Sequence, residues 1–185
     1  MGHKIVRVKK EEAVLVAIDF QTKLLPAMYE SEKLEETMVK LVKGLTAFDI
    51  PKVVTQQYTK GLGPTVESIA EVLGEFEPID KTRFSAYGDE NFRTALENTG
   101  RRTVILAGIE AHICVEQTTL DLLENGYDVL VIADCVQSRN PKNREIAMER
   151  MQNAGAVITS FESVLYELLG GAKEPEFKTI STLVK

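Results

Sequence analysis

The sequence predicts a doubly wound α/β fold, in which a mainly parallel, Rossmann-type sheet carries helices on both faces and forms three layers. Short runs of apolar and β-branched residues alternate with longer helical stretches along the chain, which is the order that βαβ units produce. The first run, Ala13 to Ile18, is apolar throughout, as expected of a strand that is buried on both faces. We find no internal repeat, low-complexity segment or inter-domain linker.

The elements of the first half follow from this spacing. Ser31 to Phe48 is predicted to be a helix with Ser31 as its N-cap, because one stripe of it is apolar: Leu34, Met38, Leu41, Val42 and Leu45. A strand over Lys52–Gln56, a turn at Gly61–Pro64, a short helix over Val66–Leu73 and a short strand over Pro78–Lys81 come next.

The second half repeats the pattern. Glycines end two of the predicted helices, and a proline opens a third. The expected elements are helix Asp89–Asn98, strand Thr103–Ala107, helix Cys114–Asn125, strand Asp128–Ala133, helix Pro141–Ala154, strand Ala156–Thr159, helix Glu162–Leu169, and a short C-terminal helix with Phe177, Ile180 and Val184 inward.

Length and composition indicate one ordinary globular domain. We expect residues 1–185 to form it, with a core over about 13–170 and a tail over 171–185 that packs on its own body or on a partner subunit. The net charge is −6, and Arg7, Lys9 and Lys10 form the one tight basic cluster. We interpret that cluster as a solvated end and expect no nucleic-acid partner.

The chain has no recognisable targeting or membrane segment. No apolar region follows Met1 to Lys4, and runs such as Ala13–Ile18 are too short to span a bilayer. Two cysteines without a Cys-x-x-Cys motif, together with two histidines, give neither a disulfide framework nor a zinc pattern. We therefore expect a cytoplasmic protein without membrane contact.

Three reactive side chains are predicted at one edge of the sheet, where ligands bind in open parallel sheets. Asp19 directly follows the first strand, Lys81 ends the third, and Cys114 follows the fourth after a short loop. Alone, each has an ordinary structural explanation: a turn or capping acid, a surface lysine and a small core residue. Their joint placement favours an active site.

The expected position of Cys114 at the start of a helix favours its thiolate, because the helix N-terminus is electropositive. Lys81 would act in the same direction, and Asp19 could take the thiol proton and later return it. Cys135 also follows a predicted strand, but no partner set surrounds it. We interpret Cys135 as structural.

These residues resemble a known family. Three motifs resemble those of the isochorismatase-like cysteine hydrolases: Asp19-Phe-Gln21, Asp80-Lys-Thr-Arg-Phe-Ser85 and Gly108-Ile-Glu-Ala-His-Ile-Cys-Val115. The resemblance covers the chain from about Ala13 to Leu169. Gln57-Tyr58, Gly61 to Thr65, Glu110-Ala111 and Thr119 to Leu123 are similar to the isochorismatase domain-containing branch.

The resemblance implies an Asp19–Lys81–Cys114 triad that cleaves a C–N bond other than a peptide bond through a cysteine thioester. It places the oxyanion hole at the backbone N–H groups of Glu110 and Cys114, with a cis peptide at Ile109–Glu110. Related nicotinamidases bind a metal through histidines after the second strand, where this chain has Val54-Thr-Gln-Gln-Tyr58. We expect neither a metal nor another cofactor. True isochorismatases lack the cysteine, so Cys114 favours C–N cleavage over vinyl-ether hydrolysis.

The substrate and its pocket are less determined. Residues in loops after strands could line the pocket or pack against neighbouring loops: Phe20, Gln21, Tyr58, Phe84 and Tyr87. An amide-like or ureide-like small molecule is the expected substrate class. His112 is interpreted as a packing or hydrogen-bonding residue. A weakly active or non-catalytic oligomeric interaction protein and a redox sensor remain alternatives, and by analogy we expect a homodimer or larger homo-oligomer.

Overall fold

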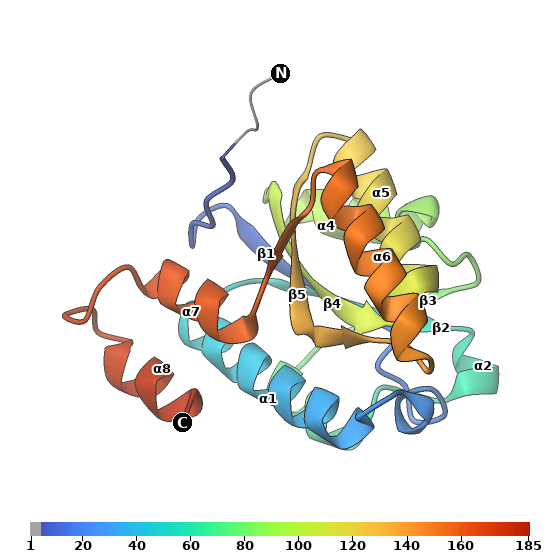
Figure 1. The fold of residues 1–185 in the computed structure, drawn as a ribbon, viewed down its shortest axis with the longest axis horizontal. Coiled ribbons are helices and arrows are strands. Elements are labelled where there is room, and N and C mark those ends of the chain that lie inside the picture. Colours follow the sequence, from blue (N-terminus) through green and yellow to red (C-terminus); the bar gives the residue numbers. More distant parts are fainter. Residues whose placement is uncertain (1–4) are drawn as a thin grey trace.

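The computed structural model describes residues 5–185 and confirms the predicted three-layer α/β fold (Figure 1). Six parallel strands form one sheet in the order β3-β2-β1-β4-β5-β6. The strands are β1 (Ala13–Ile18), β2 (Lys52–Gln57), β3 (Ile79–Lys81), β4 (Thr103–Ile109), β5 (Asp128–Gln137) and β6 (Val157–Thr159). This order reverses between β1 and β4, which makes the gap beyond their carboxyl ends the favoured ligand position.

Helices cover both faces of the sheet. They are α1 (Ser31–Ala47), α2 (Thr59–Leu62), α3 (Glu67–Leu73), α4 (Glu90–Asn98), α5 (Glu116–Glu124), α6 (Pro141–Ala154), α7 (Phe161–Leu169) and α8 (Phe177–Leu183). Two 3-10 turns lie at Leu25–Ala27 and Ala86–Gly88, and a π-helical turn spans Ala111–Val115. Within residues 5–185, no helix combines the length and the apolar character that crossing a membrane requires.

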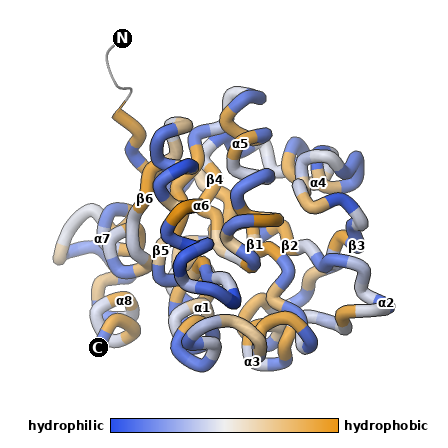
Figure 2. Tube along the Cα trace, turned by 45° about the vertical axis from the view of Figure 1, so that its right-hand side comes forward, coloured by the Kyte–Doolittle hydropathy of each residue, from blue (hydrophilic) through white to orange (hydrophobic). Residues whose placement is uncertain are grey.

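Alternating strand residues build two separate cores. In β1, Leu15 and Ala17 join the core beneath α1 and α7, whereas Val14, Val16 and Ile18 join the core beneath α4, α5 and α6. Every residue of β1 is buried, and burying a Val, Leu or Ile side chain contributes roughly 1.5–3 kcal/mol. The apolar strands therefore run through the interior while polar segments lie outside (Figure 2).

Several predicted boundaries differ from the observed ones, and two of these differences change the role of a named residue. Ser31 is the first residue of α1 and not its N-cap; that position belongs to Glu30, which lies in the left-handed region and makes no capping hydrogen bond through its side chain. β5 continues to Gln137, so Cys135 lies inside a strand and is fully buried in the core. The predicted strand ended at Ala133 because polar Asp134 interrupts the apolar run; its carboxylate accepts a hydrogen bond from the Phe161 N–H group.

Gly108 allows β4 to approach the end of β1 closely. A Cβ atom at this position would lie 2.5 Å from Ile18 Cβ and 2.8 Å from the Ile18 carbonyl oxygen, which is closer than such atoms can pack. The register between β4 and β5 also shifts between Leu106 and Gly108. The residues after β4 are thereby brought next to Asp19, which follows Ile18 directly.

The C-terminal helix packs on its own chain. α8 contacts α1 and α7, and Ile180 is fully buried between them, with Phe177 and Val184 half-buried. Of the two arrangements considered for the tail, the structure has the one within the chain.

Candidate active site

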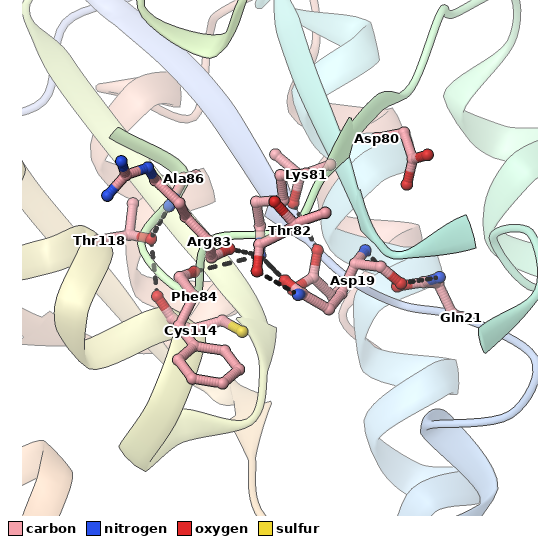
Figure 3. A network of polar contacts seen from close by, with 12 residues as sticks. Asp19, Gln21, Asp80, Lys81, Thr82, Arg83, Phe84, Ala86, Cys114 and Thr118 are labelled. Atoms are coloured by element: carbon pink, nitrogen blue, oxygen red, sulfur yellow. Dashed lines mark hydrogen bonds and ion pairs between the residues drawn. The ribbon is translucent and has the colours of Figure 1, made fainter. Parts of the chain in front are cut away.

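The predicted triad residues gather where the strand order reverses. Asp19 follows β1, Lys81 ends β3, and Cys114 lies in the π-helical turn after β4. Figure 3 shows the Cys114 sulfur on the side that faces Asp19 and Lys81. The exposed fractions are 0% for Asp19, 0% for Lys81 and 6% for Cys114, so water is largely excluded from all three groups.

Lys81 and Asp19 form a buried ion pair. Lys81 Nζ lies 2.8 Å from Asp19 Oδ2 and donates to Gln57 Oε1 at 2.7 Å and to the carbonyl oxygens of Arg83 and Phe84 at 3.2 and 3.1 Å. All four partners are acceptors, so Lys81 Nζ acts only as a donor; the ammonium form has three protons for this, one of them shared between two acceptors, whereas the neutral amine has two. Because a buried charge is tolerated only when it is paired and hydrogen-bonded, this arrangement fixes Lys81 as a cation.

The backbone directs Asp19 into the site. Its φ angle of 57° lies in the left-handed region, which Asp adopts more readily than most residues. Thr55 Oγ1 donates to Asp19 Oδ1 at 2.7 Å, and the Asp19 N–H group donates to the Thr55 carbonyl at 3.2 Å. Thr55 and Lys81 therefore hold one carboxylate oxygen each, which orients the carboxylate.

Cys114 is a protonated thiol at rest. Burial raises its pKa to about 12, the negative charge of Asp19 adds to the rise, and the positive charge of Lys81 opposes it. The expectation that the position of Cys114 favours its thiolate is therefore wrong, because the pKa is raised and not lowered. Cys114 does not begin α5; it lies within the preceding π-helical turn, and desolvation outweighs the nearby cation.

This pKa predicts how Cys114 reacts with iodoacetamide. Because the thiolate is the nucleophile, the alkylation rate should rise about tenfold per pH unit between about pH 7 and pH 10, without a plateau. Peptide mass spectrometry at each pH measures this rate, with Cys135 as the internal control. A plateau below about pH 9 would contradict the assigned protonation state.

Glu110, the residue before the π-helical turn that carries Cys114, is held by contacts outside the site. The peptide bond between Ile109 and Glu110 is cis. The Glu110 carboxylate accepts from Arg139 Nε at 3.0 and 3.1 Å and from the Arg139 N–H group at 3.0 Å. His112 Nδ1 lies 2.8 Å from Ser138 Oγ, and His112 Nε2 lies 3.4 Å from Asn143 Nδ2. The Glu110 and His112 side chains thus tie the turn to the segment between β5 and α6 and to the first turn of α6.

The proposed pocket residues are distributed unevenly. Phe20 is buried in the core, with 2% of it exposed. Tyr87 packs edge to face against Tyr127, with ring centroids 6.2 Å apart. Tyr127 directly precedes β5 and therefore lies at the amino ends of the strands, whereas Cys114 lies at their carboxyl ends. Tyr58 and Phe84 are 52% and 54% exposed and follow β2 and β3 at the edge that carries Cys114. Of these four aromatic residues, Tyr58 and Phe84 are in a position to meet a ligand.

Gln21 cross-links two loops beside the site. Its Nε2 donates to the Gln57 and Gly63 carbonyls at 3.0 and 2.7 Å, and its Oε1 accepts from the Gln57 N–H group at 2.6 Å. The side chain is fully buried, and both of its polar ends have protein partners. Gln21 therefore supports the loop after β2.

Replacing Gln21 with leucine should destabilise the fold. The change leaves three backbone groups without their partner, and we expect the free energy of unfolding to fall by about 2–4 kcal/mol. Urea denaturation followed by circular dichroism measures the loss. Gln152→Leu, on the exposed side of α6, is the matched control and should stay within about 0.5 kcal/mol of the original protein. Equal stability of the two variants would contradict this role.

Cavities and metal-binding clusters do not mark the site. A cavity of about 700 Å³ lies at the edge of the sheet, and one of about 500 Å³ lies between α1 and α6; Asp19, Lys81 and Cys114 line neither. Among residues 5–185, no group of three or more His, Cys, Asp or Glu side chains is arranged to hold a metal ion. Buried reactive groups therefore define this site.

Three supporting residues were not identified from the sequence. Thr55 orients Asp19, Gln57 accepts from Lys81, and Thr118 donates to the Cys114 carbonyl at 2.7 Å. Thr118 lies one helical turn after Cys114, a spacing that could have indicated it. Thr55 and Gln57 are two residues apart on β2, and they contact Asp19 and Lys81, respectively. These contacts can be seen only once the strand order is known.

Fold and site together define a doubly wound α/β protein with a buried cysteine beside a buried Asp–Lys ion pair. The family model described as the isochorismatase domain matches residues 13–163. Isochorismatase domain-containing protein 2 of Danio rerio is 37% identical over 182 residues, which are 97% of this chain and 90% of the relative. The chain belongs to the isochorismatase family of hydrolases, as the sequence motifs predicted.

Other relatives and solved structures agree with this assignment. Isochorismatase domain-containing protein 1 of Salmo salar is 36% identical over 93% of this chain, which spans 60% of that relative. A solved structure described as MAR1 ribonuclease from Caenorhabditis elegans is 38% identical with a TM-score of 0.90, over 97% of this chain and 92% of that one.

Two YcaC structures are similar as well. YcaC from Pseudomonas aeruginosa, solved with hexane-2,5-diol and covalent acrylamide, is 28% identical with a TM-score of 0.92, over 98% of this chain and 93% of that one. YcaC from Escherichia coli, described as an octameric hydrolase of unknown specificity, is 27% identical with a TM-score of 0.92, over 98% and 91%.

Proposed function

We propose that this protein hydrolyses a C–N bond of a small amide-like molecule through a thioester on Cys114. The observation that carries the proposal is a buried thiol beside a buried carboxylate–ammonium pair, at the point where the strand order reverses. A thiol with a raised pKa at a ligand-binding edge, as Cys114 is, is typical of a functional site.

In the first half-reaction, Cys114 Sγ attacks the carbonyl carbon and its proton passes to Asp19. The C–S bond forms while the carbonyl π electrons move to oxygen. When the tetrahedral intermediate collapses, the C–N bond breaks, Asp19 returns the proton to the departing nitrogen, and an acyl thioester remains. Because the pKa of Cys114 is about 12, transfer of this proton during the attack avoids the cost of a free buried thiolate.

In the second half-reaction, water attacks the thioester and Asp19 takes a proton from it. The C–S bond then breaks, Asp19 reprotonates the sulfur, and the carboxylic acid product leaves. The net reaction is amide plus water giving acid plus amine. Lys81 keeps its proton throughout, because its four acceptors hold the ammonium form, and its charge stabilises the Asp19 carboxylate.

The backbone N–H groups of Glu110 and Cys114 are the proposed oxyanion donors. The contact between Glu110 and Arg139 supports this assignment, because it engages the Glu110 side chain and holds the residue whose N–H group is the proposed donor. A preorganised donor of this kind changes kcat by about 10²–10³-fold in enzymes with similar intermediates.

The expected substrate is a small molecule, and the proposed reaction needs no cofactor. Tyr58 and Phe84 are exposed aromatic residues in the segments that follow β2 and β3, and they are proposed to contact the substrate. The acrylamide bound covalently in the P. aeruginosa neighbour is itself an amide. The description of the C. elegans neighbour as a ribonuclease suggests RNA, but the net charge of −6 favours an uncharged small molecule over a polyanion.

A screen of small amides, with RNA as a separate arm, tests this function. A substrate should leave its acyl half on Cys114, and rapid acid quenching followed by intact mass spectrometry would identify it. Release of an amine together with a Cys114 thioester supports the proposal. Efficient RNA cleavage, or turnover by a protein without Cys114, would overturn it, and the absence of turnover on every amide would favour the interaction-protein alternative.

We propose the remaining properties from coarser observations. A single domain over residues 1–185 is supported by the packing of α8 on α1 and α7. Two free, buried cysteines fit a reducing compartment such as the cytoplasm. A homo-oligomer is supported by the E. coli neighbour, which is described as an octameric hydrolase, and light scattering would measure the mass.

A further inference from the structure

We propose that Thr118 is a positioning residue that couples the turn carrying Cys114 to the loop that holds Lys81. The inference rests on the proposed function and assigns a role within the same site to a residue of α5. Thr118 does not contact the reacting atoms; it acts through the backbone of the turn that carries Cys114 and of the loop that holds Lys81.

The Thr118 hydroxyl bridges the two segments directly. Thr118 Oγ1 donates to the Cys114 carbonyl oxygen at 2.7 Å and accepts from the Ala86 N–H group at 2.9 Å (Figure 3). A hydroxyl has one proton and two lone pairs, so it can make both bonds at once. Thr118 is fully buried, and loss of its hydroxyl would leave the buried Ala86 N–H group without this partner.

The loop fixed by Thr118 is the loop that binds Lys81. The carbonyls of Arg83 and Phe84, three and two residues before Ala86, accept from Lys81 Nζ. Ser85 Oγ donates to Asp121 Oδ2 at 2.5 Å, so a second residue of α5 holds the same loop. A shift of this loop would therefore move two acceptors of the ammonium that pairs with Asp19.

Thr119 provides a matched comparison on the same helix. It is also fully buried, and its Oγ1 donates to the Val115 carbonyl at 2.9 Å. Such bonds to the carbonyl four residues earlier are ordinary in helices. What distinguishes Thr118 is the second bond, to Ala86 in a different segment. Thr118→Val and Thr119→Val therefore remove the same local bond, while only the first cuts the link to the loop.

The test compares Thr118→Val, Thr118→Ser and Thr119→Val in the full chain. For each, the alkylation rate of Cys114 by iodoacetamide is measured from about pH 7 to pH 10, together with the melting temperature. On a substrate found by the amide screen, kcat and KM are measured separately. Thr118→Val should lower the Cys114 alkylation rate and kcat by about tenfold or more, with KM changed by less than about threefold.

Two variants should behave like the original protein. Thr118→Ser keeps the hydroxyl and should restore most of the rate, and Thr119→Val should stay within about threefold of the original rate. A Thr118→Val rate equal to the original, an equal loss in Thr119→Val, or an equal loss in Thr118→Ser would each overturn the proposal. If Thr118→Val does not fold, Thr118→Ala is judged by the same criteria.

Failure of the positioning role can be told apart from failure of the proposed function. If Cys114 of the original protein alkylates no faster than Cys135, the nucleophile itself is wrongly assigned. If Cys114 reacts selectively and Thr118→Val leaves its rate and kcat unchanged, only the role of Thr118 is refuted.

Discussion

Replacing Cys114 with alanine should abolish hydrolysis of any amide substrate, with kcat reduced by about 10⁴-fold or more. The substitution removes the sulfur that forms the thioester, and no other cysteine of the described chain lies at this edge of the sheet. The fold should be retained, because only one buried atom is lost. The measurement is turnover per active site at saturating substrate, with the melting temperature recorded in parallel.

Cys135→Ala is the control for this prediction. Cys135 is fully buried inside β5, and its burial raises the pKa of the thiol well above the ordinary value, so it should be inert. We expect Cys135→Ala to lower stability by about 1–2 kcal/mol and to keep kcat within about threefold. Full activity of Cys114→Ala, or complete loss in Cys135→Ala, would show that the nucleophile has been assigned to the wrong residue.

The fold could be predicted because buried strands and surface helices have different residue patterns. β1 is apolar at every position, which requires cover on both faces, and α6 is bounded by Asn140 and Gly155 as cap and stop. Strand order could not be read in the same way, since neither pattern says which strands are neighbours. The placement of β1 beside β4 follows from a close approach at Gly108, which no local pattern reveals.

The site was predicted as a set of residues, but its electrostatics were not. Asp19, Lys81 and Cys114 follow strands, so their position at one edge was predictable. The protonation of Cys114 depends on how deeply it is buried and on its distance from Asp19, both of which arise from long-range packing. A helix dipole would favour the thiolate if Cys114 began a solvent-exposed helix, whereas the chain forms a buried π-helical turn there.

The pocket residues were the least predictable part. A loop position after a strand does not say whether a side chain points inward or outward. Phe20 turns into the core and Phe84 turns to solvent, although both follow strands by a few residues. For Gln21, a pocket position and packing against a neighbouring loop were both open, and the structure has the second, because both polar ends of the side chain bind the backbone of the loop after β2.

The Asp19→Asn variant should separate thiol ionisation from catalysis. Asparagine has nearly the same shape and still offers an oxygen to Lys81, which also keeps its three other acceptors. The fold should therefore survive. The variant lacks the group that takes the thiol proton and returns it to the leaving nitrogen, so kcat should fall by about 10³-fold or more.

Alkylation of Cys114 in Asp19→Asn should change in the opposite direction. The negative charge of Asp19 raises the pKa of Cys114, so removing that charge lowers this pKa and increases the thiolate fraction at a given pH. At about pH 9, iodoacetamide should therefore react with Cys114 up to about tenfold faster than in the original protein, while hydrolysis is lost. A variant that loses both reactions would indicate a collapsed site, and one that keeps hydrolysis would exclude Asp19 as the proton carrier. Only an Asp19 that both suppresses the resting thiolate and transfers its proton predicts faster alkylation together with lost turnover.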